Sequence, residues 1–307
     1  IGNLNNHIGV PLTLLSFNSE TEIGIVEMGA NHKKEIAFLC ELAKPDYGYI
    51  TNFGKAHLEG FGGIQGVIEG KSELYQYLSI NNKLAFINLE DSIQVQKAAD
   101  LKFFSFGIKK ENADVNIIDV KANPFVEINF SNLIIKSHLI GLYNANNINA
   151  ALTIGKYFGV DDIAIKEGLE SYIPENNRSQ LLSKGTNQII LDAYNANPSS
   201  MKVAIENFLQ LDNPNKIMIL GDMFELGDAS TQEHLEVLKL LLDKNEIQCF
   251  FIGSAFYANK TVTTHFHFYE TFDSFSEYLK EIKIVNSVVL IKGSRGMALE
   301  RTLQFFS

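Results

Sequence analysis

Three pieces of sequence decide the fold: VEMGANH (residues 26–32), PDYGYITNFGKAHLEGFGG (residues 45–63) and EGKSE (residues 69–73). The apolar runs GIVEMG and YGYITN, in and beside these pieces, predict two strands, the first over residues 21–28. Each run ends in polar residues, as strands do where a doubly wound sheet opens its ligand crevice. The sequence therefore predicts an α/β fold with a ligand site at the carboxyl edge of a sheet.

Polar side chains with metal and phosphate chemistry follow both predicted strands. Glu27 lies near the end of the first run, and Asn52 and His57 follow the second. Lys71 lies on the helix that comes next. A carboxylate, an imidazole and an amine at one sheet edge indicate a metal-assisted phosphate reaction. The alternative is that Lys71 is a solvated helix lysine and His57 a structural histidine, which is the commoner state of both residue types.

The segment GKS (residues 70–72) resembles the end of a phosphate-binding P-loop. The P-loop pattern requires glycine at the position of Gln65, and it requires a strand immediately before the loop, whereas this segment has a helical pattern. We therefore predict no P-loop lysine within the 307 residues.

A second alternation of strands and helices begins after YIPENNRSQ (residues 172–180), where proline, asparagine and charge cluster. We expect a domain boundary there, with domains over residues 1–175 and 176–307. The alternation of strands and helices in the second domain predicts a mostly parallel sheet.

Three polar loops follow strands of the predicted second domain, at residues 192–198, 221–227 and 292–296. Turn chemistry explains any one of them, because asparagine and proline favour turns. Three such loops at the carboxyl edge of one sheet favour a ligand site that includes Asp192.

Composition excludes several classes of protein. The chain is 46% hydrophobic and carries a net charge of −10, so it has room for a sizeable core and no general basic surface for nucleic acid. No apolar run approaches the roughly 18 residues that span a membrane. Two distant cysteines fit a reducing compartment, so we expect a cytoplasmic protein without disulfides or zinc. The chain starts at IGNLNNHIGVP without methionine, and we expect an upstream part.

Seven motifs, in order, resemble the Mur ligase family: GNLNNHIGVPLTLL, EMGANH, TNFGKAHLEGFG, EGKSELY, DAYNANPSSM, LGDMFELG and KGSRGMALE. Together they cover nearly the whole chain. The resemblance implies an incomplete central ATPase domain with a mostly parallel sheet, followed by a Rossmann-like C-terminal domain. It begins after the family's first domain and its P-loop.

The resemblance also implies an activity. It indicates an ATP-dependent amide ligase that joins D-alanyl-D-alanine to UDP-N-acetylmuramoyl-tripeptide through an acyl phosphate, with Mg²⁺ as cofactor. YNANP and GNLNNHIGVP indicate this member of the family. Without a P-loop, the 307 residues alone are not expected to turn over ATP.

Site residues follow from the resemblance position by position. It implies magnesium ligands at Glu27 and His57 and a carbamylated lysine at Lys71. It implies an adenine site at Asn144 and Asn147, a phosphate contact at Arg178 and a ribose contact at Asp192. Substrate contacts are implied at Asn6, His7, Asn195, Asn197, Lys292 and Ser294. The catalytic set is Lys71, His57 and Arg178, and Tyr143 stands where the family usually has histidine.

Two alternatives stay open at this point. One is another ligase of this class, which adds a different amino acid to a Mur-type substrate or to a folate, although YNANP argues against it. The other is a non-catalytic nucleotide-binding protein, because no P-loop lies within these residues. We expect a monomer without nucleic-acid or membrane partners.

Overall fold

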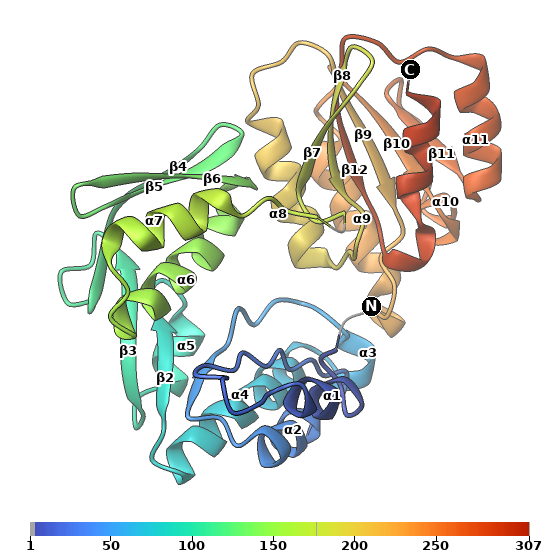
Figure 1. The fold of residues 1–307 in the computed structure, drawn as a ribbon. Helices are drawn as coiled ribbons and strands as arrows, with labels where there is room; N and C mark the ends of the chain where they lie inside the picture. Colours follow the sequence, from blue (N-terminus) through green and yellow to red (C-terminus); the bar gives the residue numbers. More distant parts are fainter. Residues whose placement is uncertain (1–3, 176, 307) are drawn as a thin grey trace. The chain divides into compact units, whose positions relative to one another are not determined.

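The computed structural model describes residues 4–175 and 177–306 (Figure 1). The chain forms two compact units, which are described separately. The first comprises the residues up to 120 together with 128–134 and 146–169, and the second comprises 121–127, 135–145 and the residues from 170 onward. The domain boundary expected after residue 175 stays a prediction.

One six-stranded sheet has the order β1-β2-β3-β4-β5-β6, and β1 to β4 pair in parallel. Its strands are β1 (Tyr47–Tyr49), β2 (Leu84–Asn88), β3 (Lys102–Ile108), β4 (Val115–Ala122), β5 (Phe125–Phe130) and β6 (Leu133–Ile140). Strand β2 is buried along most of its length, whereas β4, β5 and β6 alternate between buried and more exposed residues. This difference is typical of an inner parallel strand compared with strands that have one exposed face.

Seven α-helices lie in or next to the first unit among the described residues. They are α1 (Gly9–Leu15), α2 (Glu35–Ala43), α3 (Leu58–Phe61), α4 (Ile64–Ile80), α5 (Ser92–Lys97), α6 (Ala145–Tyr157) and α7 (Asp162–Ser171), with a 3₁₀ turn η1 (Leu142–Asn144) before α6. Tyr75 and Leu78 of α4 pack with Ala85 and Ile87 of β2 in one apolar cluster. This packing fixes α4, and with it Lys71, against the sheet.

The predicted strand over residues 21–28 was wrong. The segment has no regular secondary structure, and Ile23 and Ile25 are 58% and 85% exposed. Strand propensity depends on a neighbour that completes the ladder of backbone hydrogen bonds, and no strand among the described residues pairs with this segment. Its composition favours a strand, but the described part of the chain supplies no partner for one.

The second sheet has the order β11-β10-β9-β12-β8-β7 and confirms the predicted α/β class. All neighbours are parallel except β7 and β8, which pair antiparallel. Its strands are β7 (Gln180–Lys184), β8 (Asn187–Asp192), β9 (Lys216–Gly221), β10 (Ile247–Ile252), β11 (Phe266–Tyr269) and β12 (Val288–Lys292). All five residues of β12 are buried, because it lies between β8 and β9 in the middle of the sheet.

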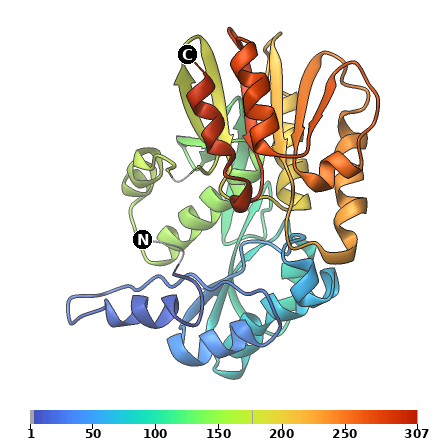
Figure 2. The same cartoon turned by 90° about the vertical axis from the view of Figure 1, so that its right-hand side faces the viewer.

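Two pairs of helices accompany this sheet: α8 (Pro198–Leu209) contacts α9 (Ser230–Leu241), and α11 (Phe272–Glu281) contacts the 3₁₀ helix η4 (Leu299–Phe305). Figure 2 shows α11 and η4 side by side in front of the sheet. The remaining elements are α10 (Ser254–Ala258), η2 (Gly227–Ala229) and η3 (Arg295–Met297). In residues 4–175 and 177–306, no helix combines the length and apolar character that a membrane span needs.

Candidate functional site

The best-defined polar cluster lies at the carboxyl edge of the second sheet. Strands β8 and β12 are parallel neighbours, and Asp192 pairs in register with Lys292 at their last positions. The loop after β9 begins at Asp222 and reaches the same edge. Parallel pairing therefore brings together the three polar loops that the sequence singled out.

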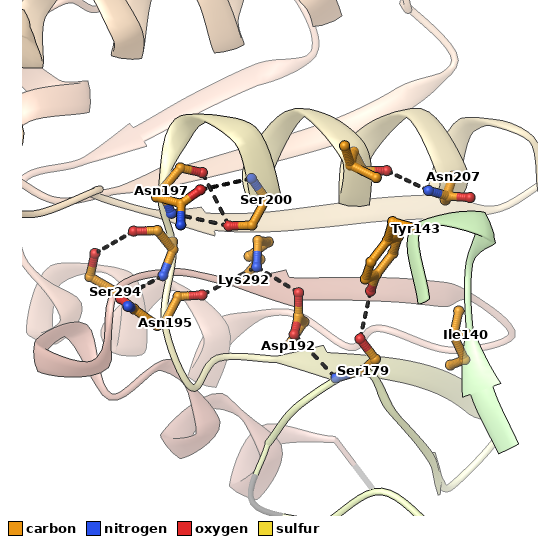
Figure 3. Close-up of polar contacts among 12 residues, drawn as sticks. Ile140, Tyr143, Ser179, Asp192, Asn195, Asn197, Ser200, Asn207, Lys292 and Ser294 are labelled. Carbon is orange, nitrogen blue, oxygen red and sulfur yellow. Dashed lines mark hydrogen bonds and ion pairs between the residues drawn. The ribbon is translucent and has the colours of Figure 1, made fainter. Parts of the chain in front are cut away.

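Asp192 and Lys292 form a buried ion pair at this edge (Figure 3). The Lys292 Nζ lies 2.6 Å from Asp192 Oδ2 and donates a second hydrogen bond, of 3.2 Å, to the carbonyl oxygen of Asn195. Lys292 is 1% exposed. A buried ammonium needs such partners, because an unpaired charge in the interior is costly. The pair therefore fixes the carboxylate and the start of the following loop.

The loop after β8 is organised by its own asparagines. Asn197 caps α8: its Oδ1 accepts the Ser200 N–H at 2.9 Å, and the Ser200 hydroxyl accepts the Asn197 N–H at 3.1 Å. Pro198 takes the first helical position, which suits a residue without an N–H. Asn195 is exposed, and its Oδ1 accepts the Ala196 N–H at 2.8 Å. The YNANP motif therefore makes a rigid turn, whichever of its residues meets a ligand.

Ser294 joins the three loops to each other. Its N–H donates to the Asp222 carbonyl oxygen at 3.1 Å, and its Oγ accepts the Phe224 N–H at 2.9 Å. The same hydroxyl donates to the Ala196 carbonyl oxygen at 3.4 Å. At 2% exposure, Ser294 lies beneath the surface of the edge and holds the loops in a fixed arrangement.

A second buried network supports the Asp222 loop, and the sequence analysis missed it. The Asp222 carboxylate accepts the N–H groups of Ala255 and Phe256 at 2.9 and 3.0 Å. His234, which is fully buried, accepts the Met223 N–H at Nε2 and donates from Nδ1 to the Ser230 carbonyl oxygen. A lone histidine inside a helix gives no signal in the sequence that it supports the loop before that helix.

Arg178 lies in the second unit, just before β7. Its guanidinium carbon lies 3.9 Å from the ring centroid of Tyr194, which follows β8 by two residues. The side chain is exposed, and the described part of the chain offers it no ion-pair partner. Because Arg178 is exposed, its guanidinium remains accessible to an anion while it lies over the ring, as a phosphate contact requires.

Ser179 connects this region with the sheet edge and with the turn before α6. Its N–H donates to Asp192 Oδ1 at 3.1 Å, and its hydroxyl lies 2.5 Å from the Tyr143 hydroxyl (Figure 3). Asn144, which is 7% exposed, donates to the Ile140 carbonyl oxygen at 2.8 Å and to Ser179 Oγ at 3.3 Å. Burial and the carboxylate of Asp192 raise the pKa of Tyr143, so its hydroxyl keeps its proton.

In the first unit, Lys71 projects from α4 and is half-buried. Its Nζ donates to the carbonyl oxygen of Asn52 at 2.7 Å, so the segment after β1 and the helix do meet as predicted. Burial lowers the pKa of Lys71 to about 8, although the charge of Asp91 acts in the opposite direction. Glu69 and Glu73 make other bonds, to Lys33 and to the N–H groups of Lys34 and Ala37.

Glu27 and Asn6 of the first unit are exposed and lie outside helices and strands. Glu27 is exposed and accepts a hydrogen bond of 3.1 Å from Asn5. The Asn6 Oδ1 accepts the N–H groups of Ile8 and Gly9 at 3.0 Å, which fixes the turn before α1.

His7 is exposed, His57 is half-buried with φ of 52° immediately before α3, and Asn147 is exposed on α6. Within the described ranges, no three carboxylate, histidine or cysteine side chains gather as a ready metal site. The structure therefore brings Lys71 to Asn52. The predicted metal site would need ligands beyond the carboxylates, histidines and cysteines of the described residues.

Comparison with known proteins assigns the chain. Residues 1–155 match the family model described as the Mur ligase middle domain, and residues 177–295 match the Mur ligase, glutamate ligase domain. The chain belongs to the Mur ligase family. These two matches account for both α/β regions in the order that the motifs predicted.

Relatives of this Mur ligase chain agree with each other. The UDP-N-acetylmuramoyl-tripeptide–D-alanyl-D-alanine ligase of Bacillus subtilis is 32% identical over 99% of the chain and 68% of its own length. A crystal structure of MurF from Thermotoga maritima in complex with ADP has a TM-score of 0.84 at 26% identity, over 100% of this chain and 72% of that one. A crystal structure of MurF from Acinetobacter baumannii has a TM-score of 0.83 at 28% identity, over 99% of this chain and 68% of that one. The chain thus spans about two thirds of each relative.

Proposed function

We propose that the protein is the ATP-dependent ligase that joins D-alanyl-D-alanine to UDP-N-acetylmuramoyl-tripeptide. The observation that carries the proposal is the similarity to ligases of that name over nearly the whole chain, at 27–32% identity. The YNANP turn, the Asp222 loop and the KGS loop (residues 292–294), which meet at one sheet edge, support it as the shared architecture of a ligand site.

The proposed reaction has two steps. A carboxylate oxygen of the tripeptide attacks the γ-phosphorus of ATP, ADP leaves, and an acyl phosphate forms. The amine of D-alanyl-D-alanine then attacks the acyl carbon, and phosphate leaves from the tetrahedral intermediate. Positioning and charge stabilisation dominate such phosphoryl transfer, so cationic side chains and fixed loops are the expected contribution of the protein.

Roles follow for the residues of the second unit. Arg178 contacts an ATP phosphate, and Asp192 accepts from the ribose with the oxygen lone pairs that Lys292 and Ser179 leave available. The burial of Lys292 and Ser294 favours a role in holding the site over direct contact with substrate. Asn195 and Asn197, with Asn6 and His7 of the first unit, are the proposed substrate-side residues. Asn144 and Asn147 are the proposed adenine-side residues.

The proposed binding of Mg²⁺ by Glu27, His57 and Lys71 depends on one condition. An ammonium at Lys71 repels a divalent cation, whereas a carbamate on the same nitrogen offers oxygen ligands. The pKa of about 8 supports that modification, because carbamate formation requires the neutral amine. When bound, Mg²⁺ supplies neutralisation of phosphate charge. The modified Lys71 would then offer oxygen ligands to Mg²⁺ from a position next to Asn52.

The domain organisation is part of the same proposal. We place the central ATP-binding domain at residues 1–175 and the C-terminal ligase domain at residues 176–307. The family matches to residues 1–155 and 177–295 support this division. Cytoplasmic location and a monomeric state remain predictions from the sequence.

The test is a ligation assay with the complete reading frame. Phosphate release should require ATP, UDP-N-acetylmuramoyl-tripeptide and D-alanyl-D-alanine together, and the amide product should appear by mass spectrometry. Single amino acids in place of the dipeptide are the matched control. If single amino acids support phosphate release as well as D-alanyl-D-alanine does, the result would favour another member of the family. Nucleotide binding without product under every condition would favour the non-catalytic alternative.

A further inference from the structure

The three residues around Arg178 form an unusual backbone segment. Asn177 has φ of 58° and Ser179 has φ of 47°, so left-handed residues stand on both sides of Arg178. Asparagine adopts this region fairly readily, but for serine it is uncommon. Such conformations persist only where surrounding contacts determine them.

Three hydrogen bonds within the second unit hold this segment. The Tyr194 N–H donates to the Asn177 carbonyl oxygen at 3.1 Å, which fixes the backbone before Arg178. The Ser179 N–H donates to Asp192 Oδ1 at 3.1 Å, and the Ser179 hydroxyl bonds to that of Tyr143 at 2.5 Å (Figure 3). The backbone is therefore anchored on both sides of Arg178, to β8 and to the turn at Tyr143.

The side chain of Arg178 is held by a different contact. Its guanidinium lies over the Tyr194 ring, with 3.9 Å between the guanidinium carbon and the ring centroid. An arginine free in solvent samples many rotamers, and it loses that freedom when it binds an anion. A guanidinium that lies over a ring has lost part of this rotamer freedom before the anion binds, while its N–H donors remain available for oxygen atoms.

We propose that Tyr194 is a positioning residue for Arg178, and that Tyr143 acts with it by fixing Ser179. The ring of Tyr194 holds the guanidinium in the orientation that meets an ATP phosphate. This inference rests on the proposed phosphate role of Arg178 and adds to it the residues that prepare Arg178 before nucleotide arrives. The aromatic ring of Tyr194 does this work, and its hydroxyl is dispensable.

Steady-state kinetics of the enzyme made from the complete reading frame test whether the Tyr194 ring positions Arg178. Tyr194→Leu should raise KM for ATP roughly two- to fivefold, the effect of one exposed cation–π contact, with a smaller change in kcat. Tyr194→Phe keeps the ring and should restore the KM for ATP. The matched control is Phe272→Leu, which removes a ring that stacks on Arg301 at the same 3.9 Å and should leave KM for ATP unchanged.

A double-mutant cycle separates the two proposals. Arg178→Ala should raise KM for ATP more than Tyr194→Leu does, and adding Tyr194→Leu to Arg178→Ala should have little further effect. If Arg178→Ala leaves ATP kinetics unchanged in a folded protein, the proposed phosphate role is wrong. If Arg178→Ala is impaired but Tyr194→Leu matches the unmutated protein, Arg178 contacts ATP and the positioning role of Tyr194 is wrong.

A second measurement does not depend on the variants being active. In the unmutated protein the side-chain protons of Arg178 should show an upfield ring-current shift by NMR, assigned by their loss in Arg178→Lys. The shift should persist in Tyr194→Phe. In Tyr143→Phe it should weaken, because Ser179 loses its hydroxyl partner. An Arg178 signal at the position of a solvated arginine would overturn the inference even if Tyr194→Leu fails to fold.

Discussion

At the scale of single residues, burial decides what each charged group does. Lys292 and Lys71 both have proposed functions. The Nζ of Lys292 forms an ion pair with the Asp192 carboxylate at 2.6 Å. Lys71 has a neutral carbonyl oxygen as its hydrogen-bond partner, and burial brings its pKa to about 8. The first lysine is therefore held in an ion pair, and the second is suited to chemistry of the neutral amine.

Lys71 should form a carbamate in the folded protein. A lysine with a pKa of about 8 is half neutral at that pH, whereas one at the ordinary value of 10.5 is almost wholly protonated. In ¹³C-bicarbonate at pH 8 we expect one carbamate resonance by ¹³C NMR, absent from Lys71→Gln. As the pH falls below 8, the neutral fraction and the resonance should decline together.

Lys83 provides the internal comparison for this experiment. Its ion pair with Asp46, at 2.5 Å, raises its pKa, so it should carry no carbamate under the same conditions. A resonance that survives in Lys71→Gln, or none at pH 8 in the unmutated protein, would contradict the assignment.

At the scale of elements, α8 is the helix that the site depends on. It begins at the asparagine cap of the YNANP turn, so the end of the turn and the start of the helix are one structure. Its buried residues Met201, Ile205 and Phe208 fix the opposite side of the helix in the core. The turn therefore takes its rigidity from helix packing.

Removing the cap should destabilise the protein without disrupting the core. We expect Asn197→Ala to lower the free energy of unfolding of the second unit by about 1 kcal/mol, because the Ser200 N–H at the helix start loses its partner. Urea denaturation followed by circular dichroism measures the change. Lys202→Ala on the same helix removes only a surface pair of 3.8 Å and should cost much less. Equal losses in the two variants would mean that the cap contributes nothing beyond an ordinary surface contact.

At the scale of the whole molecule, each unit has its own core. Ile50, Leu78 and Ile87 belong to a cluster in the first unit, and Ile219, Val289 and Phe275 belong to a cluster in the second. Around the change of unit, Tyr172 and Ile173 are 57% and 65% exposed and lie outside helices and strands. Exposed segments without regular structure are where proteases cut first.

Limited chymotrypsin digestion should therefore cut first after Tyr172. Mass spectrometry should detect two fragments that meet there, and Tyr172→Gln should slow their appearance severalfold while cleavage elsewhere continues unchanged. Tyr47, which is 40% exposed but lies in β1, is the internal comparison. Early cleavage at Tyr47, with Tyr172 intact, would place the weak point of the chain within a domain and would contradict the boundary proposed after residue 175.

The sequence by itself determined the class of fold, the order of most elements and the family. Buried parallel strands read as continuous apolar runs, and VVLIK and IQCFFI have that pattern whatever their neighbours are. Polar residues directly after such runs also mark the ligand edge, which is how Asp192 was found. Local composition carries this information because strand burial and turn chemistry act over a few residues.

Only the tertiary structure decided which residues meet. The strand expected over residues 21–28 is absent because a ladder needs a partner, and β7 went unrecognised because QLLSK has little apolar pattern until β8 pairs with it. Lys292 and Asp192 stand 100 residues apart in sequence, and the stack of Arg178 on Tyr194 likewise joins separate segments. Contacts of this kind depend on strand order and loop path, which are properties of the packed molecule that no local stretch encodes.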